Sequence, residues 1–142
     1  LLMLPRDQFV AGLASFLLAH VAYIVAFSAG IPLGTAPALL VPLAAMAALL
    51  LRLVWPGLGR LRLPVVLYSA TIFLMVWQAW GWRWVIDTPG SRLAAVGATL
   101  FMASDAVLAL NRFRRPFRGA QAVIMLTYVA AQALIALSVG TD

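Results

Sequence analysis

Long apolar runs alternate with short polar breaks along the 142-residue chain. Five of these runs reach roughly 20 residues, the length at which a helix crosses about 30 Å of hydrocarbon. They cover approximately residues 9–29, 37–55, 64–82, 92–111 and 119–139. The runs lack period-two alternation, and unpaired backbone groups are not tolerated in lipid, so they predict helices rather than strands. We therefore expect an all-α, polytopic transmembrane helix bundle that forms a single domain.

The breaks carry Pro and Gly, as at Trp55-Pro56-Gly57 and Thr88-Pro89-Gly90, and differ in charge. Only Arg83 and Arg92 lie on one side of the predicted bundle. Eight arginines lie on the other: Arg6, Arg52, Arg60, Arg62, Arg112, Arg114, Arg115 and Arg118. The positive-inside rule makes this second side cytoplasmic, and a tryptophan cluster at residues 77–84 marks the opposite interface. We expect a multi-pass protein of a bacterial inner membrane.

Composition narrows the function classes. Hydrophobic residues make up 65% of the chain and charged residues 10%, which excludes a soluble domain. Cysteine and glutamate are absent and His20 is the single histidine, so we expect neither a disulfide framework nor a metal site, and no cofactor. We expect the net charge of +6 to set the membrane topology and to contact anionic lipid headgroups, rather than to bind nucleic acid.

Asp105 is the clearest exception to the apolar pattern. It precedes Arg112 by seven residues and so lies roughly 10 Å below the cytoplasmic end of its helix. An ionisable group is costly to place in hydrocarbon, and it commonly marks a functional site. In the structural alternative, Asp105 pairs with an interhelical donor or with Arg112, two turns along the same face.

Other polar side chains recur at helical spacing. They are Tyr68, Thr71 and Gln78 in the third segment and Gln121, Tyr128 and Gln132 in the last. In the first segment, His20 and Tyr23 share one face. Together these positions predict a polar lumen, whereas interhelical hydrogen bonding as packing is the plainer interpretation of each residue alone.

Two stretches carry a family resemblance. FVAGLASFLLAHVAYIVAF, at 9–27, is similar to the pattern F-x-x-G-L-x-x-F-x-x-x-H-x-x-Y. RLAAVGATLFMASDAVLALNRF, at 92–113, is similar to G-A-x-L-F-x-x-S-D-x-x-L-A-x-x-R-F. Both patterns resemble those of the lysoplasmalogenase-like membrane proteins, also called the YhhN-like family. The likeness extends over essentially the whole chain.

The resemblance implies a bundle of about eight helices, roughly three of them before Leu1, so we expect an N-terminally truncated chain. The apolar run Leu1-Leu2-Met3-Leu4 is consistent with a helix entered partway. The family pattern also places a Gly-Asp pair just before the position of Leu1. That Asp would lie roughly 10 Å below the same surface as Asp105, which suits a pair of carboxylates.

The resemblance further implies that a lysoplasmalogen, a vinyl-ether lysophospholipid, is hydrolysed to a fatty aldehyde and a glycerophospho headgroup. An acid protonates the enol-ether carbon, and the oxocarbenium ion then takes up water. We expect one carboxyl group to be the acid and a second to stabilise the cation and activate water, with Asp105 as one of the two. The expected substrate-binding residues are His20, Tyr23, Tyr68, Arg112, Tyr128 and Gln132.

A small membrane transporter or lipid-binding bundle is the alternative, with Asp105 as a proton relay or a structural residue. Only the hydrolase releases aldehyde from a vinyl-ether lysophospholipid. The sequence leaves open the headgroup, the oligomeric state and which carboxyl is the acid.

Overall fold

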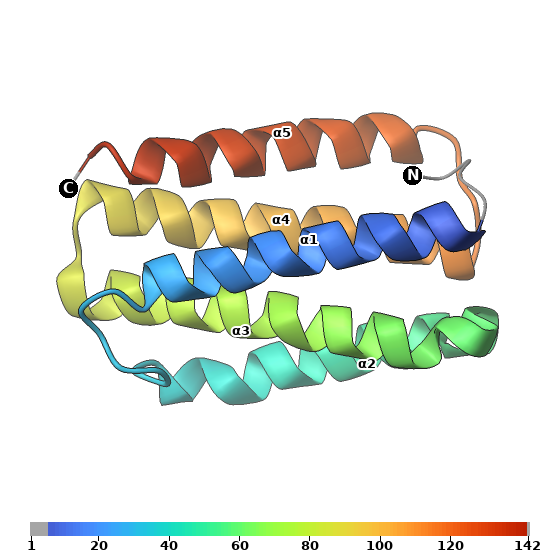
Figure 1. Ribbon diagram of the computed structural model, residues 1–142, viewed down its shortest axis with the longest axis horizontal. Helices are drawn as coiled ribbons and strands as arrows, with labels where there is room; N and C mark the ends of the chain where they lie inside the picture. The colour runs from blue at the N-terminus through green and yellow to red at the C-terminus, as the bar shows by residue number, and fades with distance from the viewer. Residues whose placement is uncertain (1–5, 142) are drawn as a thin grey trace.

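The computed structural model describes residues 6–141, with side chains from residue 11 onward. Its five long helices run back and forth beside one another (Figure 1). They are α1 (Arg6–Phe27), α2 (Leu40–Leu58), α3 (Arg62–Ile86), α4 (Pro89–Phe113) and α5 (Ala120–Ser138). Short 3-10 turns, η1 (Pro37–Leu39) and η2 (Gly59–Leu61), precede α2 and α3. The predicted all-α bundle is confirmed.

The turn between α3 and α4 shows why α4 begins before residue 92. The backbone N–H of Ser91 donates to Thr88 Oγ1 at 3.1 Å, and the N–H of Thr88 donates to Ser91 Oγ at 2.9 Å. This reciprocal pair is a capping box, and Pro89 fits the first turn because no N–H is needed there. Thr88-Pro89-Gly90, predicted as a break, therefore starts the helix.

Asp87 ends α3 in the left-handed region, with φ of 48°. Its carboxylate forms ion pairs with Arg83 at 2.7 Å and Arg92 at 2.8 Å. The hydrogen bond from Arg92, together with the charges of both arginines, lowers the pKa of the Asp87 carboxyl. These ion pairs hold the Asp87 carboxylate between two guanidinium groups at the end of the bundle that carries few arginines.

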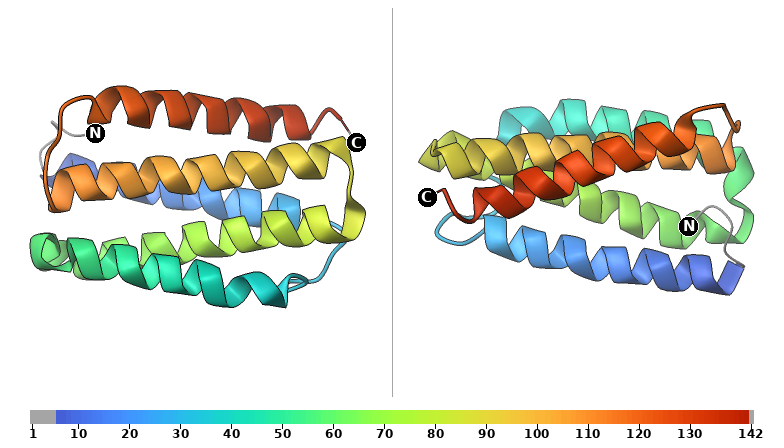
Figure 2. Two further views of the ribbon diagram at one scale, coloured as in Figure 1. Left: turned by 180° about the vertical axis from the view of Figure 1, so that it is seen from behind. Right: turned by 90° about the horizontal axis from the view of Figure 1, so that it is seen from above.

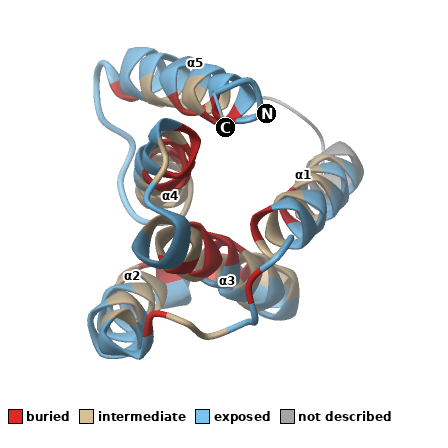
Figure 3. Cartoon of the chain, turned by 90° about the vertical axis from the view of Figure 1, so that its left-hand side faces the viewer, coloured by how far each residue is buried: buried red, intermediate tan, exposed pale blue. Residues whose placement is uncertain are grey.

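Helix α4 is the centre of the packing. Helices α3 and α5 lie along it, α1 packs on α3, and α2 contacts both α3 and α4 (Figure 2). Figure 3 shows that the buried residues of α3 and α4 face their neighbours, whereas the outer helix faces are exposed. The approach of α5 to α4 is close, because a Cβ at Gly97 would lie 2.8 Å from Ile135 Cγ1.

The end of α2 meets the end of α4 backbone to backbone. Helix α2 continues through Pro56 to Leu58 and stops at Gly59, which has φ of 50°. A Cβ at Gly57 would lie 1.8 Å from the carbonyl oxygen of Phe113, so only glycine fits this approach. The contact positions the end of α4 that carries Arg112.

The outer surface is apolar. Leu18, Val41 and Leu126 are among the large hydrophobic residues that are about 70% exposed. Three described stretches are long and apolar enough to cross a membrane: Pro37–Ile86, Pro89–Phe113 and Ala120–Ser138. The first contains both α2 and α3. The chain is a multi-pass membrane protein.

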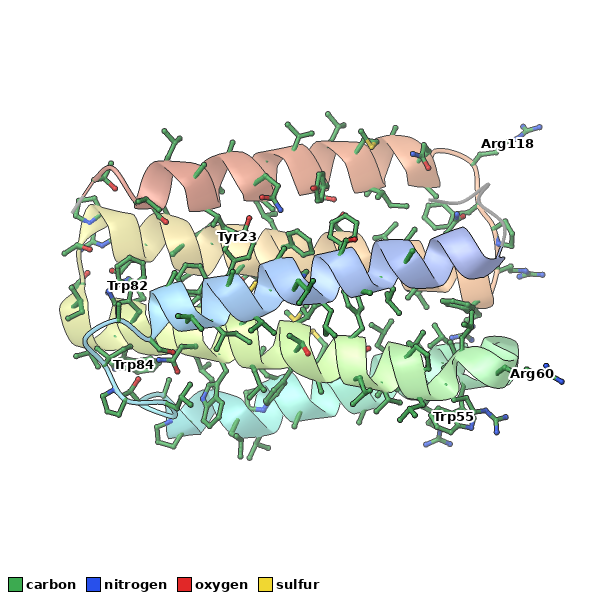
Figure 4. The ribbon with its side chains drawn as sticks, in the orientation of Figure 1. Tyr23, Trp55, Arg60, Trp82, Trp84 and Arg118 are labelled. Carbon is green, nitrogen blue, oxygen red and sulfur yellow. The ribbon has the colours of Figure 1, made fainter. Side chains whose placement is uncertain are left out.

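The two ends of the bundle differ chemically, as Figure 4 shows. Arg60 and Arg118 extend from one end, and Trp82 and Trp84 lie near the other. At the arginine-rich end the Arg62 guanidinium carbon lies 5.1 Å from the ring centroid of Trp55. Alternating helix directions thus gather the arginines that are far apart in sequence.

Candidate active site

Asp105 lies on α4 and is bonded to α3. The Tyr68 hydroxyl donates a hydrogen bond to Asp105 Oδ2. The preceding residue, Ser104, is buried and donates to the carbonyl oxygen of Ile124 at 3.1 Å, which ties this turn of α4 to α5. Asp105 is therefore held where α3, α4 and α5 come together.

Asp105 is bonded to an interhelical donor rather than to Arg112. Among the described side chains, the ion pairs are those of Asp87 with Arg83 and Arg92. Tyr68 keeps its own proton in its bond to Asp105, so the carboxyl group has a neutral donor beside it. A carboxyl in this setting can gain or lose a proton without breaking an ion pair.

A cavity of about 550 Å³ adjoins Asp105 and takes lining residues from all five long helices. Tyr68, Asp105, Arg112 and Tyr128 line it, so four of the expected site residues share one space. Arg112 follows Asp105 by two helical turns, roughly 10 Å toward the arginine-rich end. Most other lining residues are apolar, so the cavity suits an elongated ligand with a charged end and a hydrocarbon tail.

Tyr23 and Gln132 form a separate pair. The Tyr23 hydroxyl donates to Gln132 Oε1 at 2.7 Å and joins α1 to α5. Neither residue is among those that line the cavity. Their contact closes the bundle on the side of Asp105 that is farther from the arginine-rich end.

His20 is fully buried between the cavity and this pair. Its Nδ1 bonds to the carbonyl oxygen of Phe16 on the same helix. Its ring stands edge to face against Phe101, with centroids 4.6 Å apart, and against Tyr68, with centroids 5.4 Å apart. His20 itself does not line the cavity.

Thr71 and Gln78, the other two polar residues expected on α3 to face a polar lumen, do not line the cavity. Thr71 donates to the carbonyl oxygen of Leu67 on its own helix. Gln78 donates to the Pro32 carbonyl oxygen at 3.4 Å. Gln78 thereby anchors the loop before α2 to α3.

The sequence analysis did not single out Phe101 of α4. It is fully buried and contacts the rings of Phe16, His20 and Tyr128. It precedes Asp105 by four residues and so shares its helix face, which was the available signal. Phe101 therefore packs against aromatic side chains of α1 and α5.

Among the side chains that the structure describes, those of residues 11–141, His, Cys, Asp and Glu form no group of three or more that could hold an ion. The site is therefore described by its carboxyl, hydroxyl and guanidinium groups.

The YhhN family profile matches residues 1–139. The chain belongs to the YhhN family. It is 32% identical over 139 residues to the uncharacterized membrane protein YhhN of Escherichia coli O6:H1, covering 97% of this chain and 66% of that protein. It is 38% identical over 144 residues to lysoplasmalogenase TMEM86A of Homo sapiens, covering 94% of this chain and 57% of that protein.

A bacterial lysoplasmalogenase, from Mycobacterium bovis, is 35% identical over 136 residues and is covered over 49% of its length. This YhhN-family chain therefore spans between about half and two thirds of the curated relatives it matches. No solved structure matches it.

Proposed function

We propose that this YhhN-family protein is a membrane hydrolase that cleaves the vinyl-ether bond of lysoplasmalogens. The observation that carries the proposal is the Tyr68-bonded carboxyl group of Asp105 in the wall of a largely apolar cavity. Relatives named lysoplasmalogenase at 35–38% identity support the same chemistry.

Asp105 supplies acid chemistry in this proposal. Its carboxyl proton adds to the enol-ether carbon, and the adjacent carbon becomes an oxocarbenium ion. Water bonds to that carbon, and the hemiacetal breaks down to aldehyde and the glycerol hydroxyl. Apolar cavity residues such as Ile72 and Met102 exclude bulk water and strengthen the electrostatic interactions of the site.

Tyr68, Tyr128 and Arg112 hold the substrate. Arg112 lies toward the interface, where a guanidinium group can bind the lipid phosphate with two parallel hydrogen bonds. The roughly 10 Å between Arg112 and Asp105 leaves room for a glycerol backbone between phosphate and ether. Tyr23 and Gln132 support this space by joining α1 to α5.

A second carboxylate completes the proposed pair. The family pattern supplies it from an Asp just before the position of Leu1, and its role would be to stabilise the cation. Because the chain spans only part of its relatives' length, the proposed activity is assigned to the full-length protein.

A pair of substrates tests the proposal. The full-length protein in lipid vesicles receives a vinyl-ether lysophospholipid or its saturated ether analogue, and released aldehyde is measured. We expect aldehyde from the vinyl ether alone, because only its double bond can be protonated to an oxocarbenium ion. Aldehyde from neither substrate would refute the hydrolase and leave the transporter or lipid-binding alternative.

A further inference from the structure

The cavity reaches the arginine-rich end of the bundle at a small group of residues that we call the mouth: Arg112, Phe113 and Gln121. Arg112 and Phe113 are the last two residues of α4, and Gln121 is the second residue of α5. Gln121 lines the cavity and is also exposed. If Arg112 binds the substrate phosphate, the headgroup beyond the phosphate lies at the mouth or farther out.

The loop between α4 and α5 places more positive charge beside the mouth. It carries three exposed arginines, Arg114, Arg115 and Arg118. The backbone N–H of Phe117 donates to Asn111 Oδ1 at 3.0 Å. The N–H of Arg115 donates to the carbonyl oxygen of Leu110 at 2.9 Å. These bonds hold the loop backbone, and with it three guanidinium groups, against the end of α4.

Carboxyl groups that could balance this charge lie elsewhere. Among residues 11–141, whose side chains the structure describes, the acidic residues are Asp87 and Asp105. Asp87 lies at the opposite end of the bundle in ion pairs with two arginines, and Asp105 lies roughly 10 Å deeper in the cavity. Earlier in the sequence, Asp7 directly follows Arg6, so their formal charges cancel. A cationic headgroup at the mouth would therefore meet positive charge without a described counter-charge.

The aromatic ring at the mouth already faces a cation. The Arg112 guanidinium carbon lies 5.7 Å from the centroid of the Phe113 ring. Quaternary ammonium groups are bound by aromatic faces, and the Arg112 guanidinium takes this one. The Gln121 amide is neutral and can exchange hydrogen bonds with a hydroxyl group, whereas the methyl groups of choline offer no N–H donor.

We propose that the mouth selects lysoplasmalogens whose headgroup carries a net negative charge, such as phosphoglycerol, over zwitterionic ones that carry choline or ethanolamine. This inference rests on the proposed function and names its substrate class. The phosphate binds Arg112, and the glycerol hydroxyl groups bind the Gln121 amide. An ammonium group in the same place is repelled by the arginines of the loop.

Two substitutions with the same change in charge test whether the mouth itself makes this selection. Gln121→Glu places a carboxylate at the mouth in a side chain of nearly the same shape. Arg60→Gln also makes the arginine-rich end more negative by one charge, but Arg60 is exposed on η2 and does not line the cavity. A general attraction between anionic lipids and the protein surface would respond equally to both changes.

The assay is a competition in the full-length protein. Vesicles of phosphatidylcholine at low salt contain equal amounts of two vinyl-ether lysophospholipids that share one alkenyl chain and carry phosphoglycerol or phosphocholine. Mass spectrometry measures the two glycerophospho products, and their initial ratio gives the ratio of kcat/KM.

We expect the wild type to cleave the phosphoglycerol substrate at least about fivefold faster, the effect of roughly one arginine near an anionic lipid. Gln121→Glu should lower this ratio at least about fivefold. Arg60→Gln should leave it nearly unchanged. A wild-type ratio near one would overturn the inference, and so would equal shifts in the two variants.

Salt provides a second measurement that needs no variant. Exposed charges are screened at high ionic strength, so the wild-type ratio should fall toward one at about 0.5 M salt. A preference that persists unchanged at this salt would contradict selection by the arginines of the loop. If the wild type releases no aldehyde from either substrate, the proposed function itself fails, whereas equal release from both overturns only the headgroup preference.

Discussion

The hydrogen bond between Tyr68 and Asp105 is the contact on which the chemistry of the site depends. It joins two helices through a single hydroxyl group. The bond keeps the carboxyl group in one orientation in the wall of the cavity. Orientation of this kind commonly contributes as much to catalysis as the proton itself.

Removing that hydroxyl should slow the reaction without unfolding the protein. We expect Tyr68→Phe to lower kcat for aldehyde release by about 10- to 100-fold, the range of a hydrogen bond to a charged group. The ring that packs against His20 is retained. Tyr128→Phe is the matched control: its hydroxyl has no hydrogen bond to Asp105, and its rate should change less. Equal losses in the two variants would contradict the role given to Tyr68.

At the residue scale, sequence spacing within one helix was informative, whereas contacts between helices could not be derived from it. The positions of Asp105 and Arg112 along one helix gave their separation directly, and both line the cavity. The hydrogen bond from Tyr23 to Gln132 could not be predicted from the sequence, because it depends on the register between α1 and α5. The burial of His20 against Tyr68 depends in the same way on the register between α1 and α3.

At the element scale, a capping box starts α4 and a glycine conformation ends α2. The break at Trp55-Pro56-Gly57 was expected to end a helix, yet α2 runs to Leu58 because the stop is the left-handed Gly59. Proline near the last turn is tolerated in membrane helices, since water and neighbouring groups satisfy the freed carbonyl. The residue types alone do not show whether the helix ends at Pro56 or at Gly59.

The contact at Gly57 gives a direct stability prediction. We expect Gly57→Ala to lower the free energy of unfolding by about 1–3 kcal/mol, because its Cβ would meet the carbonyl oxygen of Phe113. Thermal unfolding in detergent measures the change. Gly140→Ala is the control, since no atom lies within 4 Å of its Cβ position. Equal unfolding temperatures for both variants would show that α2 and α4 do not meet as described.

At the scale of the whole molecule, the uneven arginines predict orientation. The end that carries Arg60 and Arg118 should face the cytoplasm, and the Trp84 end the opposite side. The all-helical bundle followed from run length because lipid leaves the backbone few alternatives. The packing of α3 and α5 on α4, of α1 on α3 and of α2 on both α3 and α4 did not follow, since apolar faces in lipid do not select their neighbours.

Single cysteines test this orientation, and residues 1–142 contain none of their own. Arg118→Cys and Trp84→Cys would be compared in full-length protein without other cysteines. We expect an impermeant thiol reagent added to intact cells to label Trp84→Cys and to reach Arg118→Cys only after lysis. The reverse pattern would contradict the assigned topology.

The most direct test of the central claim is aldehyde release by Asp105→Asn in the full-length protein. Asp87→Asn is the matched control, because it makes the same chemical change at an exposed carboxylate outside the cavity. We predict that Asp105→Asn folds and lowers the rate at least about 100-fold, while Asp87→Asn stays near wild type. Asp105→Asn that retains a rate close to wild type would contradict the account.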